Sequence, residues 1–341
     1  MVWTGSKILA IPLTEPERLF GKPDDIRSVF HILAMQWHPD RPTGDTEVFQ
    51  HINDLHAKAV DIAEAGMWKT PGELKFSVGT KHYTLHYFKS FDFELGTGYL
   101  SETTVTYVIR QEFADLAENA RKVINNFTFP DKETERVMRM YLPKIKGYYE
   151  TTDSIVLMIE KPADLIRMRD LLDHLGGKVD SRHVAWMVSR MMMHCEYMEW
   201  ANITHNDLSL DTLFVCPEHH TVCVLGGWWY SVPVNAKPLA LLQRTINHAP
   251  SEVIRDKKTS VATDLELARL TARELLGNAN GIHLMHDKNI PAPMVNWLRL
   301  VSAGNAMKDY TQWREHILGD SFGKRKFVKM LIEASDVYSP A

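Results

Sequence analysis

The chain has 341 residues and a formal net charge of −4; 45% of the residues are hydrophobic and 24% are charged. This length and composition are typical of a globular protein with two or three folded units, and the charge excludes general electrostatic attraction to nucleic acid. The one basic run, at 323–329, is interpreted as a solvated helix face rather than a nucleic-acid patch. The apolar runs are too short to span a membrane, and no basic leader precedes the first of them. We therefore expect a cytoplasmic protein without a membrane partner.

The cysteines, Cys195, Cys216 and Cys223, are odd in number and form no Cys-x-x-Cys pair. This pattern predicts reduced thiols and an intracellular protein. His219 and His220 lie between Cys216 and Cys223, which leaves a metal site open as an alternative. The spacing matches none of the usual metal-binding patterns, so we interpret the segment as a polar turn between two strands.

Two amphipathic helices are predicted near the N-terminus, at 24–37 and 45–65. The apolar residues of each segment recur at helical spacing and make one stripe. Pro39 prevents the two helices from being continuous, and Gly66 is expected to end the second. The result is a helical hairpin whose loop reads HPDRPTG.

The rest of the chain changes from strand patterns to helical ones. The stretch 74–110 is rich in β-branched and aromatic residues and predicts three consecutive antiparallel strands. Two helices and then two strands follow, at 114–127, 131–142, 146–151 and 154–160. From Pro162 onward the pattern is mainly helical, with one hairpin at 213–227. Five strands with embedded helices, followed by a helical half, indicate the α+β class.

The segments LFGKPDDIRSVFHILAMQWHPDR and FQHINDLHAKAV resemble the J-domain of DnaJ-type co-chaperones, over about residues 16–66. In that family the HPD loop docks on a DnaK-type chaperone and triggers its ATP hydrolysis. The residues that the resemblance assigns to this contact are His38, Pro39, Asp40, Arg27 and Arg41. J-domains usually present several basic residues on the first helix of the hairpin, whereas this helix carries Arg27 and His31, so charge steering is expected to be weak. Without the resemblance, HPD would be only a polar loop that breaks a helix.

The segment ITHNDLSLDTLFV, at 203–215, resembles the catalytic loop of protein kinases. Other segments resemble the hinge, the long helix before the loop, the end of the activation segment and the helix after it: SIVLMIEKPADL, SRHVAWMVSRMMMHCEYMEWANI, HAPSEV and TSVATDLELARLTARELLG. This resemblance covers about residues 75–320. It implies a two-lobed kinase-like fold with a five-stranded antiparallel N-lobe sheet and a mainly helical C-lobe. The expected domains are a J-domain-like hairpin at 1–70, an N-lobe at 71–160 and a C-lobe at 161–341.

The kinase resemblance also assigns roles in and near this loop. Asp207 matches the catalytic base, whereas His205 and Asp264 are expected to be structural, with Asp264 bracing the loop. Trp228 and Trp229 either pack over a vacated nucleotide cleft or form part of a partner surface. The methionine-rich helix before the loop is interpreted as a buried central helix rather than a groove for promiscuous binding.

Several positions depart from the kinase pattern. Arg110 stands where the family has a lysine, and Glu133 or Glu135 is expected to pair with it. Thr212 and Leu225 stand at the two magnesium-ligand positions, and no GxGxxG loop is present. A leucine cannot bind a hard cation that prefers oxygen ligands, so the pattern indicates a pseudokinase that needs no cofactor and no metal.

Three hypotheses of function remain open. The leading one is a J-domain co-chaperone or adaptor whose pseudokinase part binds an unknown protein client. The second is an atypical ATP-binding kinase that uses Asp207 and a rearranged metal site, and only in this case would ATP and magnesium be cofactors. The third is a non-catalytic interaction scaffold in which both modules are inactive.

Overall fold

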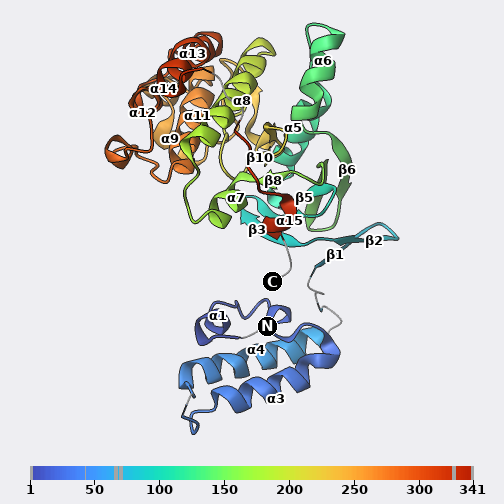
Figure 1. Ribbon diagram of the computed structural model, residues 1–341. Helices are drawn as coiled ribbons and strands as arrows, with labels where there is room; N and C mark the ends of the chain where they lie inside the picture. The colour runs from blue at the N-terminus through green and yellow to red at the C-terminus, as the bar shows by residue number, and fades with distance from the viewer. Residues whose placement is uncertain (1–2, 43, 65–67, 69–71, 325–327, 339–341) are drawn as a thin grey trace. The chain divides into compact units, whose positions relative to one another are not determined.

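The computed structural model describes residues 3–42, 44–64, 68, 72–324 and 328–338. It is a mixed α+β structure with an N-terminal helical region and antiparallel sheets, as Figure 1 shows. The chain divides into two compact units, Met1–Lys89 and Ser90–Ser339. In the part of the chain that is described, no helix is long and apolar enough to cross a membrane.

The first unit contains the predicted helical hairpin. Its helices are α1 (Gly5–Leu9), α2 (Glu17–Phe20), α3 (Ile26–Trp37) and α4 (Thr46–Glu64). Helices α3 and α4 lie side by side, drawn in blue in Figure 1, and enclose a core that includes Leu33, Ile52 and Leu55. Val48 is also buried, because α1 packs on α4 with Gly5 against the Val48 side chain. Gly66 lies outside the described residues.

The prediction of three strands in 74–110 is wrong, because this stretch holds five. Strands β1 (Glu73–Val78) and β2 (Lys81–His86) form a separate hairpin in the first unit. Val78 pairs with Lys81 across a two-residue turn in which Gly79 has a φ of 57°. Such a tight turn needs a positive φ, which glycine adopts without strain. One glycine inside a long β-rich run was too weak a signal to separate the two strands.

The second unit contains a five-stranded sheet in the order β3-β4-β5-β7-β6. Its strands are β3 (Lys89–Phe93), β4 (Gly96–Leu100), β5 (Thr104–Arg110), β6 (Ile145–Glu150) and β7 (Ser154–Glu160). The pairings β4–β5, β5–β7 and β6–β7 are antiparallel. Helices α5 (Ala114–Asn125) and α6 (Lys132–Met138) lie between β5 and β6 in the sequence, as predicted. The inner strands β5 and β7 are buried on both faces, so they carry much of the core.

The remainder of the second unit is mainly helical. Its helices are α7 (Met168–His174), α8 (Ser181–Trp200), α9 (Gln243–His248), α10 (Ser251–Asp256), α11 (Val261–Leu275), α12 (Ala292–Arg299), α13 (Ala306–Gln312), α14 (Leu318–Phe322) and α15 (Ala334–Tyr338). Helix α8 packs on α11, and Met187, Met191 and Met192 are fully buried there. The interpretation of α8 as a buried helix is confirmed. The basic run at 323–329 lies partly outside the described residues, and its interpretation stays a prediction.

Short strands position the loops of the site. Strands β8 (Ile166–Arg167), β10 (Leu213–Cys216) and β11 (Thr221–Val224) form an antiparallel sheet in the order β11-β10-β8. Strand β9 (Ile203–Thr204) pairs with β12 (Val232–Pro233). The predicted polar turn between β10 and β11 is confirmed. These pairings bring the loop 205–212 beside the segment 225–231.

Candidate functional site

The HPD loop lies in the turn between α3 and α4. His38 Nδ1 accepts the backbone N–H of Asp40 at 3.2 Å, and the His38 ring packs edge-on against Phe49. The backbone N–H of Arg41 donates to His38 O at 2.9 Å, which closes the turn. The side chains of His38 and Asp40 are 47% and 91% exposed, and Pro39 and Arg41 are also exposed. The loop therefore presents the predicted contact residues to solvent on a hydrogen-bonded backbone.

Helix α3 presents an exposed face with little charge beside this loop. Ile32 and Met35 are 65% and 59% exposed. Arg27 and His31 are exposed on the same helix, and Arg27 is its only arginine or lysine. Long-range attraction to an acidic partner from this helix is therefore weak, and Ile32 and Met35 offer apolar surface that a partner could bury.

In the second unit, Asp264 of α11 holds the start of the loop 205–212. Its Oδ2 accepts the backbone N–H of His205 at 2.8 Å, and its Oδ1 accepts that of Asn206 at 2.7 Å. All three residues are buried. Burial raises the pKa of Asp264 to about 7, and the two N–H donors oppose this rise. These two bonds are the contacts that a residue bracing the loop would make.

His205 connects this loop to the segment 225–231. Its Nδ1 accepts the backbone N–H of Asp207 at 3.2 Å, so the neutral ring carries its proton on Nε2, which donates to Gly226 O at 2.9 Å. Burial lowers the pKa of His205 to about 3, so the ring stays neutral. Its edge contacts Trp228, with ring centroids 4.8 Å apart. These contacts tie the His205 ring to both segments.

Asp207, the predicted catalytic base, is 4% exposed. Burial raises its pKa well above the usual range, and the nearby Glu94 raises it further. Within the part of the chain that is described, no lysine or arginine forms an ion pair with it. A general base must be ionised and within reach of the proton that it accepts. Burial therefore disfavours the ionised carboxylate of Asp207, which is the form that a general base needs.

The two predicted metal positions offer no free oxygen ligand. Thr212 Oγ1 donates to Asp207 O at 2.7 Å and accepts the backbone N–H of Ser209 at 3.0 Å, so its hydroxyl is used within the loop. Leu225 is buried in the core, and its backbone N–H donates to Thr212 O at 3.1 Å. Magnesium needs oxygen ligands in near-octahedral geometry, which these two side chains do not provide.

The expected pairing of Arg110 is wrong. Arg110 is exposed at the end of β5, pairs with Glu112 at 2.8 Å and lies over the ring of Phe113. Glu135 pairs instead with Arg139, and Glu133 with Arg136, both within the segment that contains α6. Arg110 takes a nearby partner because its side chain emerges at the surface, whereas α6 presents its glutamates to solvent.

Tyr107 occupies the cleft position that Arg110 was expected to fill. It lies three residues earlier on β5 and is 2% exposed. Its ring contacts Trp229 and Phe93, with centroids 5.0 and 5.4 Å away, and its hydroxyl has no hydrogen-bond partner among the described residues. Asn119 of α5 donates to Trp229 O at 3.2 Å and to Ser231 O at 2.8 Å. Helix α5, rather than α6, therefore holds the segment 225–231.

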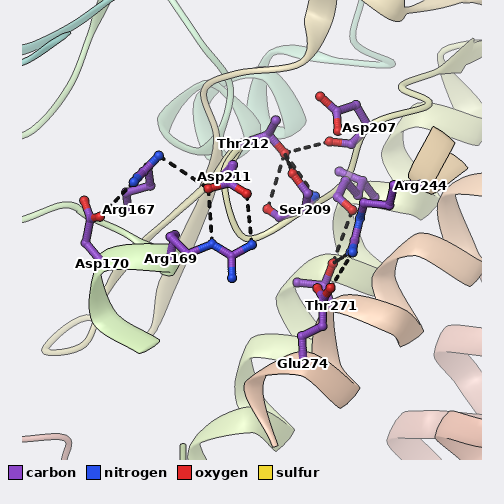
Figure 2. Close-up of polar contacts among 11 residues, drawn as sticks. Arg167, Arg169, Asp170, Asp207, Ser209, Asp211, Thr212, Arg244, Thr271 and Glu274 are labelled. Carbon is purple, nitrogen blue, oxygen red and sulfur yellow. Dashed lines mark hydrogen bonds and ion pairs between the residues drawn. The ribbon is translucent and has the colours of Figure 1, made fainter. Parts of the chain in front are cut away.

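These elements surround a cavity of about 340 Å³, at the small end of the range for ligand pockets. Its lining combines aromatic rings with charged groups: Phe91, Phe93, Tyr107, Trp229, Asp207, Asp211, Arg169 and Arg244. Figure 2 shows that the arginines point to carboxylates, since Arg169 pairs with Asp211 at 3.0 Å and Arg244 pairs with Glu274. The charges of both arginines are thus neutralised within the protein, which leaves little net attraction for a polyphosphate.

The neighbouring rim of the cavity is held by a buried arginine. Arg167 Nη2 donates to Asp170 Oδ1 at 2.9 Å, as Figure 2 shows. The Arg167 guanidinium also lies 4.0 Å from the ring centroid of Phe91. Tyr338 of α15 donates from its hydroxyl to Asp170 Oδ2 at 2.9 Å and accepts the backbone N–H of Arg167. The C-terminal helix is therefore part of the structure that fixes this rim.

Trp228 and Trp229 are both buried, which excludes the partner-surface alternative for them. Trp228 Nε1 donates to Val224 O at 2.9 Å, and Trp229 lines the cavity. All three cysteines are free, as predicted, and all three are buried.

Comparison with known proteins does not assign the chain to a family. No family model matches the chain, and no curated protein matches it. The function is therefore inferred from the residues and contacts described above.

Proposed function

We propose that the protein is a J-domain co-chaperone or adaptor. Its N-terminal hairpin would engage a DnaK-type chaperone through the HPD loop, and its second unit would bind an unknown protein client. The observation that carries the proposal is the loop itself. His38 and Asp40 are exposed at the turn of an antiparallel helical hairpin, on a backbone closed by its own hydrogen bonds.

The polar side chains of the loop have no evident structural purpose beyond the turn. Asp40 is almost wholly exposed and adds nothing to the core of the first unit. A loop that only broke a helix could use many residue types, and Pro39 alone would interrupt the helix. Exposed polar groups on a rigid scaffold are a common arrangement for a contact site, which supports a binding role for this tripeptide.

The surface beside the loop suggests how the chaperone would be held. Ile32 and Met35 can bury apolar area, whereas Arg27 and Arg41 supply only a small positive charge. Screening by salt weakens contacts between exposed charges but not apolar burial. The affinity should therefore depend on His38 and on apolar contact, and only weakly on ionic strength.

We also propose a kinase-like but non-catalytic second unit. The five-stranded sheet followed by helices, and the bracing of the loop 205–212 by Asp264, support the kinase-like fold. Three features argue against phosphoryl transfer. The hydroxyl of Thr212 is hydrogen-bonded within the loop, the side chain of Leu225 is apolar and buried, and burial raises the pKa of Asp207. The cavity beside Asp207 keeps an ATP-binding alternative testable.

A binding titration tests the chaperone proposal. Immobilised full-length protein is titrated with an ATP-bound DnaK-type chaperone, for the wild type, His38→Gln and His286→Gln. His286 is exposed in the second unit and controls for the same substitution elsewhere. We expect His38→Gln to abolish binding and His286→Gln to bind as the wild type does. Equal binding by the wild type and His38→Gln would reject the HPD contact, and no binding by the wild type would favour the scaffold hypothesis.

A further inference from the structure

A group of three potential metal ligands lies outside the cavity described above. One side-chain ligand atom from each of Asp164, Cys216 and His219 lies within 4.8 Å of the others. Cys216 ends strand β10, His219 lies in the turn before β11, and Asp164 lies between β7 and β8. The sequence shows only the Cys-x-x-His spacing of this group, because Asp164 comes 52 residues before Cys216 and is brought in by the fold.

The sulfur of Cys216 is hydrogen-bonded to the other residues of this group. Cys216 Sγ donates a hydrogen bond to Asp164 Oδ2 at 2.9 Å, and the backbone N–H groups of Glu218 and His219 donate to the sulfur. These contacts gather Asp164 and the turn around the sulfur, while burial and the hydrogen bond to Asp164 raise the pKa of the Cys216 thiol to about 12, so a bound metal ion would have to displace the thiol proton. The other cysteine of the hairpin differs, because Cys223 Sγ donates to the backbone oxygen of Met140 at 3.3 Å.

The exposure of the three side chains allows a metal ion to enter. Cys216 is buried at the base, Asp164 is half-buried and His219 is exposed. In a tetrahedral zinc site the ligand atoms lie about 3.3 to 3.6 Å apart, given metal–ligand bonds of about 2.0 to 2.3 Å. A shift of about 1 Å by the exposed His219 would close the group around an ion. The fourth position would face solvent and hold water.

The donor set identifies the class of metal. One thiolate, one imidazole and one carboxylate suit zinc and other borderline transition metals, and they do not suit magnesium or calcium. We propose that Asp164, Cys216 and His219 form a zinc site that ties the β10–β11 turn to the segment before β8. On binding, the Cys216 thiol releases its proton to solvent, a metal–sulfur bond forms, and Asp164 exchanges its hydrogen bond from sulfur for a bond to the metal.

Lys161 lies close enough to oppose the metal. Lys161 is buried in the same segment and interacts electrostatically with Asp164. Its Nζ donates to Pro162 O at 2.9 Å and to Leu165 O at 3.2 Å, so the ammonium is directed at backbone carbonyls rather than at the sulfur. The repulsion lowers the metal affinity without occupying the position of a ligand.

Cobalt titration of the reduced, chelator-treated full-length protein tests the proposal. The wild type should bind one equivalent and develop a thiolate-to-cobalt charge-transfer band together with the visible bands of a tetrahedral ion, and zinc should displace the cobalt. Cys216→Ser should abolish the charge-transfer band, whereas Cys223→Ser should keep it. His219→Gln and Asp164→Asn should weaken binding by about tenfold or more.

Three results would overturn the zinc site. The first is a wild type that shows no charge-transfer band. The second is a band that survives in Cys216→Ser, and the third is an affinity that is unchanged in His219→Gln, because in both cases the metal would be bound elsewhere. His219 is exposed, so His219→Gln remains an informative variant even if Cys216→Ser does not fold.

Discussion

Removal of the Asp264 carboxylate would show how strongly the loop 205–212 is held. In Asp264→Ala, the buried N–H groups of His205 and Asn206 lose the acceptors that now lie 2.8 and 2.7 Å away. Each orphaned buried N–H costs about 1 to 3 kcal/mol, so the variant should lose about 2 to 6 kcal/mol of unfolding free energy. Asp264→Asn keeps one carbonyl oxygen and should lose about half as much. Urea-induced unfolding followed by tryptophan fluorescence measures both losses.

The pH dependence of this loss follows from the raised pKa of Asp264. The folded state has a pKa of about 7 and the unfolded state a value near 3.8, so the folded state binds the proton more tightly. The stability from this group is full below about pH 4 and is lost as the pH rises through about 7. The loss caused by Asp264→Ala should therefore be about 2 kcal/mol larger at about pH 5.5 than at about pH 7.5.

Hydrogen exchange locates the effect. In Asp264→Ala the amides of His205 and Asn206 should exchange much faster than in the wild type. The amides of the central strand β5 should remain among the slowest to exchange. A loss of stability below about 0.5 kcal/mol, or unchanged exchange at these two amides, would refute the bracing role. A loss that is larger at the higher pH would show that the two N–H donors outweigh burial in setting the pKa of Asp264.

Three further predictions concern the second unit. Burial lowers the pKa of His194 to about 4, so its contribution to the unfolding free energy is full above about pH 6.5 and falls by about 3 kcal/mol as the pH drops toward 4. His194→Gln should flatten this part of the pH profile of urea unfolding. An unchanged slope would show that His194 is not the group responsible. Arg269 and Asp309 form a fully buried ion pair at 2.9 Å, so Asp309→Ala should cost about 3 to 5 kcal/mol, and the added change Arg269→Met should recover part of the loss in the same assay. Millimolar ATP with magnesium should leave the melting temperature unchanged, and a rise with nucleotide concentration would revive the ATP-binding alternative.

The helical hairpin could be predicted from the sequence because its information is local. The apolar spacing of α3 and α4 and the helix-breaking Pro39 define both helices and the turn between them. Gly79 was the local signal that could have separated β1 from β2, but a single glycine also occurs at bulges within strands.

The details of the second unit depended on information that is not local. Strand β5 is buried on both faces, so alternation could not show that Tyr107, rather than Arg110, faces the cavity. Asn119 carries no motif, and its bonds to the segment 225–231 arise only from the packing of α5. Asp164 joins Cys216 and His219 across a long separation in the chain, which sequence spacing does not reveal.

The most direct test of the proposed co-chaperone role is single-turnover ATP hydrolysis by a DnaK-type chaperone in the presence of this protein. The wild type and His286→Gln should accelerate hydrolysis, and His38→Gln should leave it at the basal rate. An equal rate with the wild type and His38→Gln, whether accelerated or basal, would contradict the role assigned to the HPD loop.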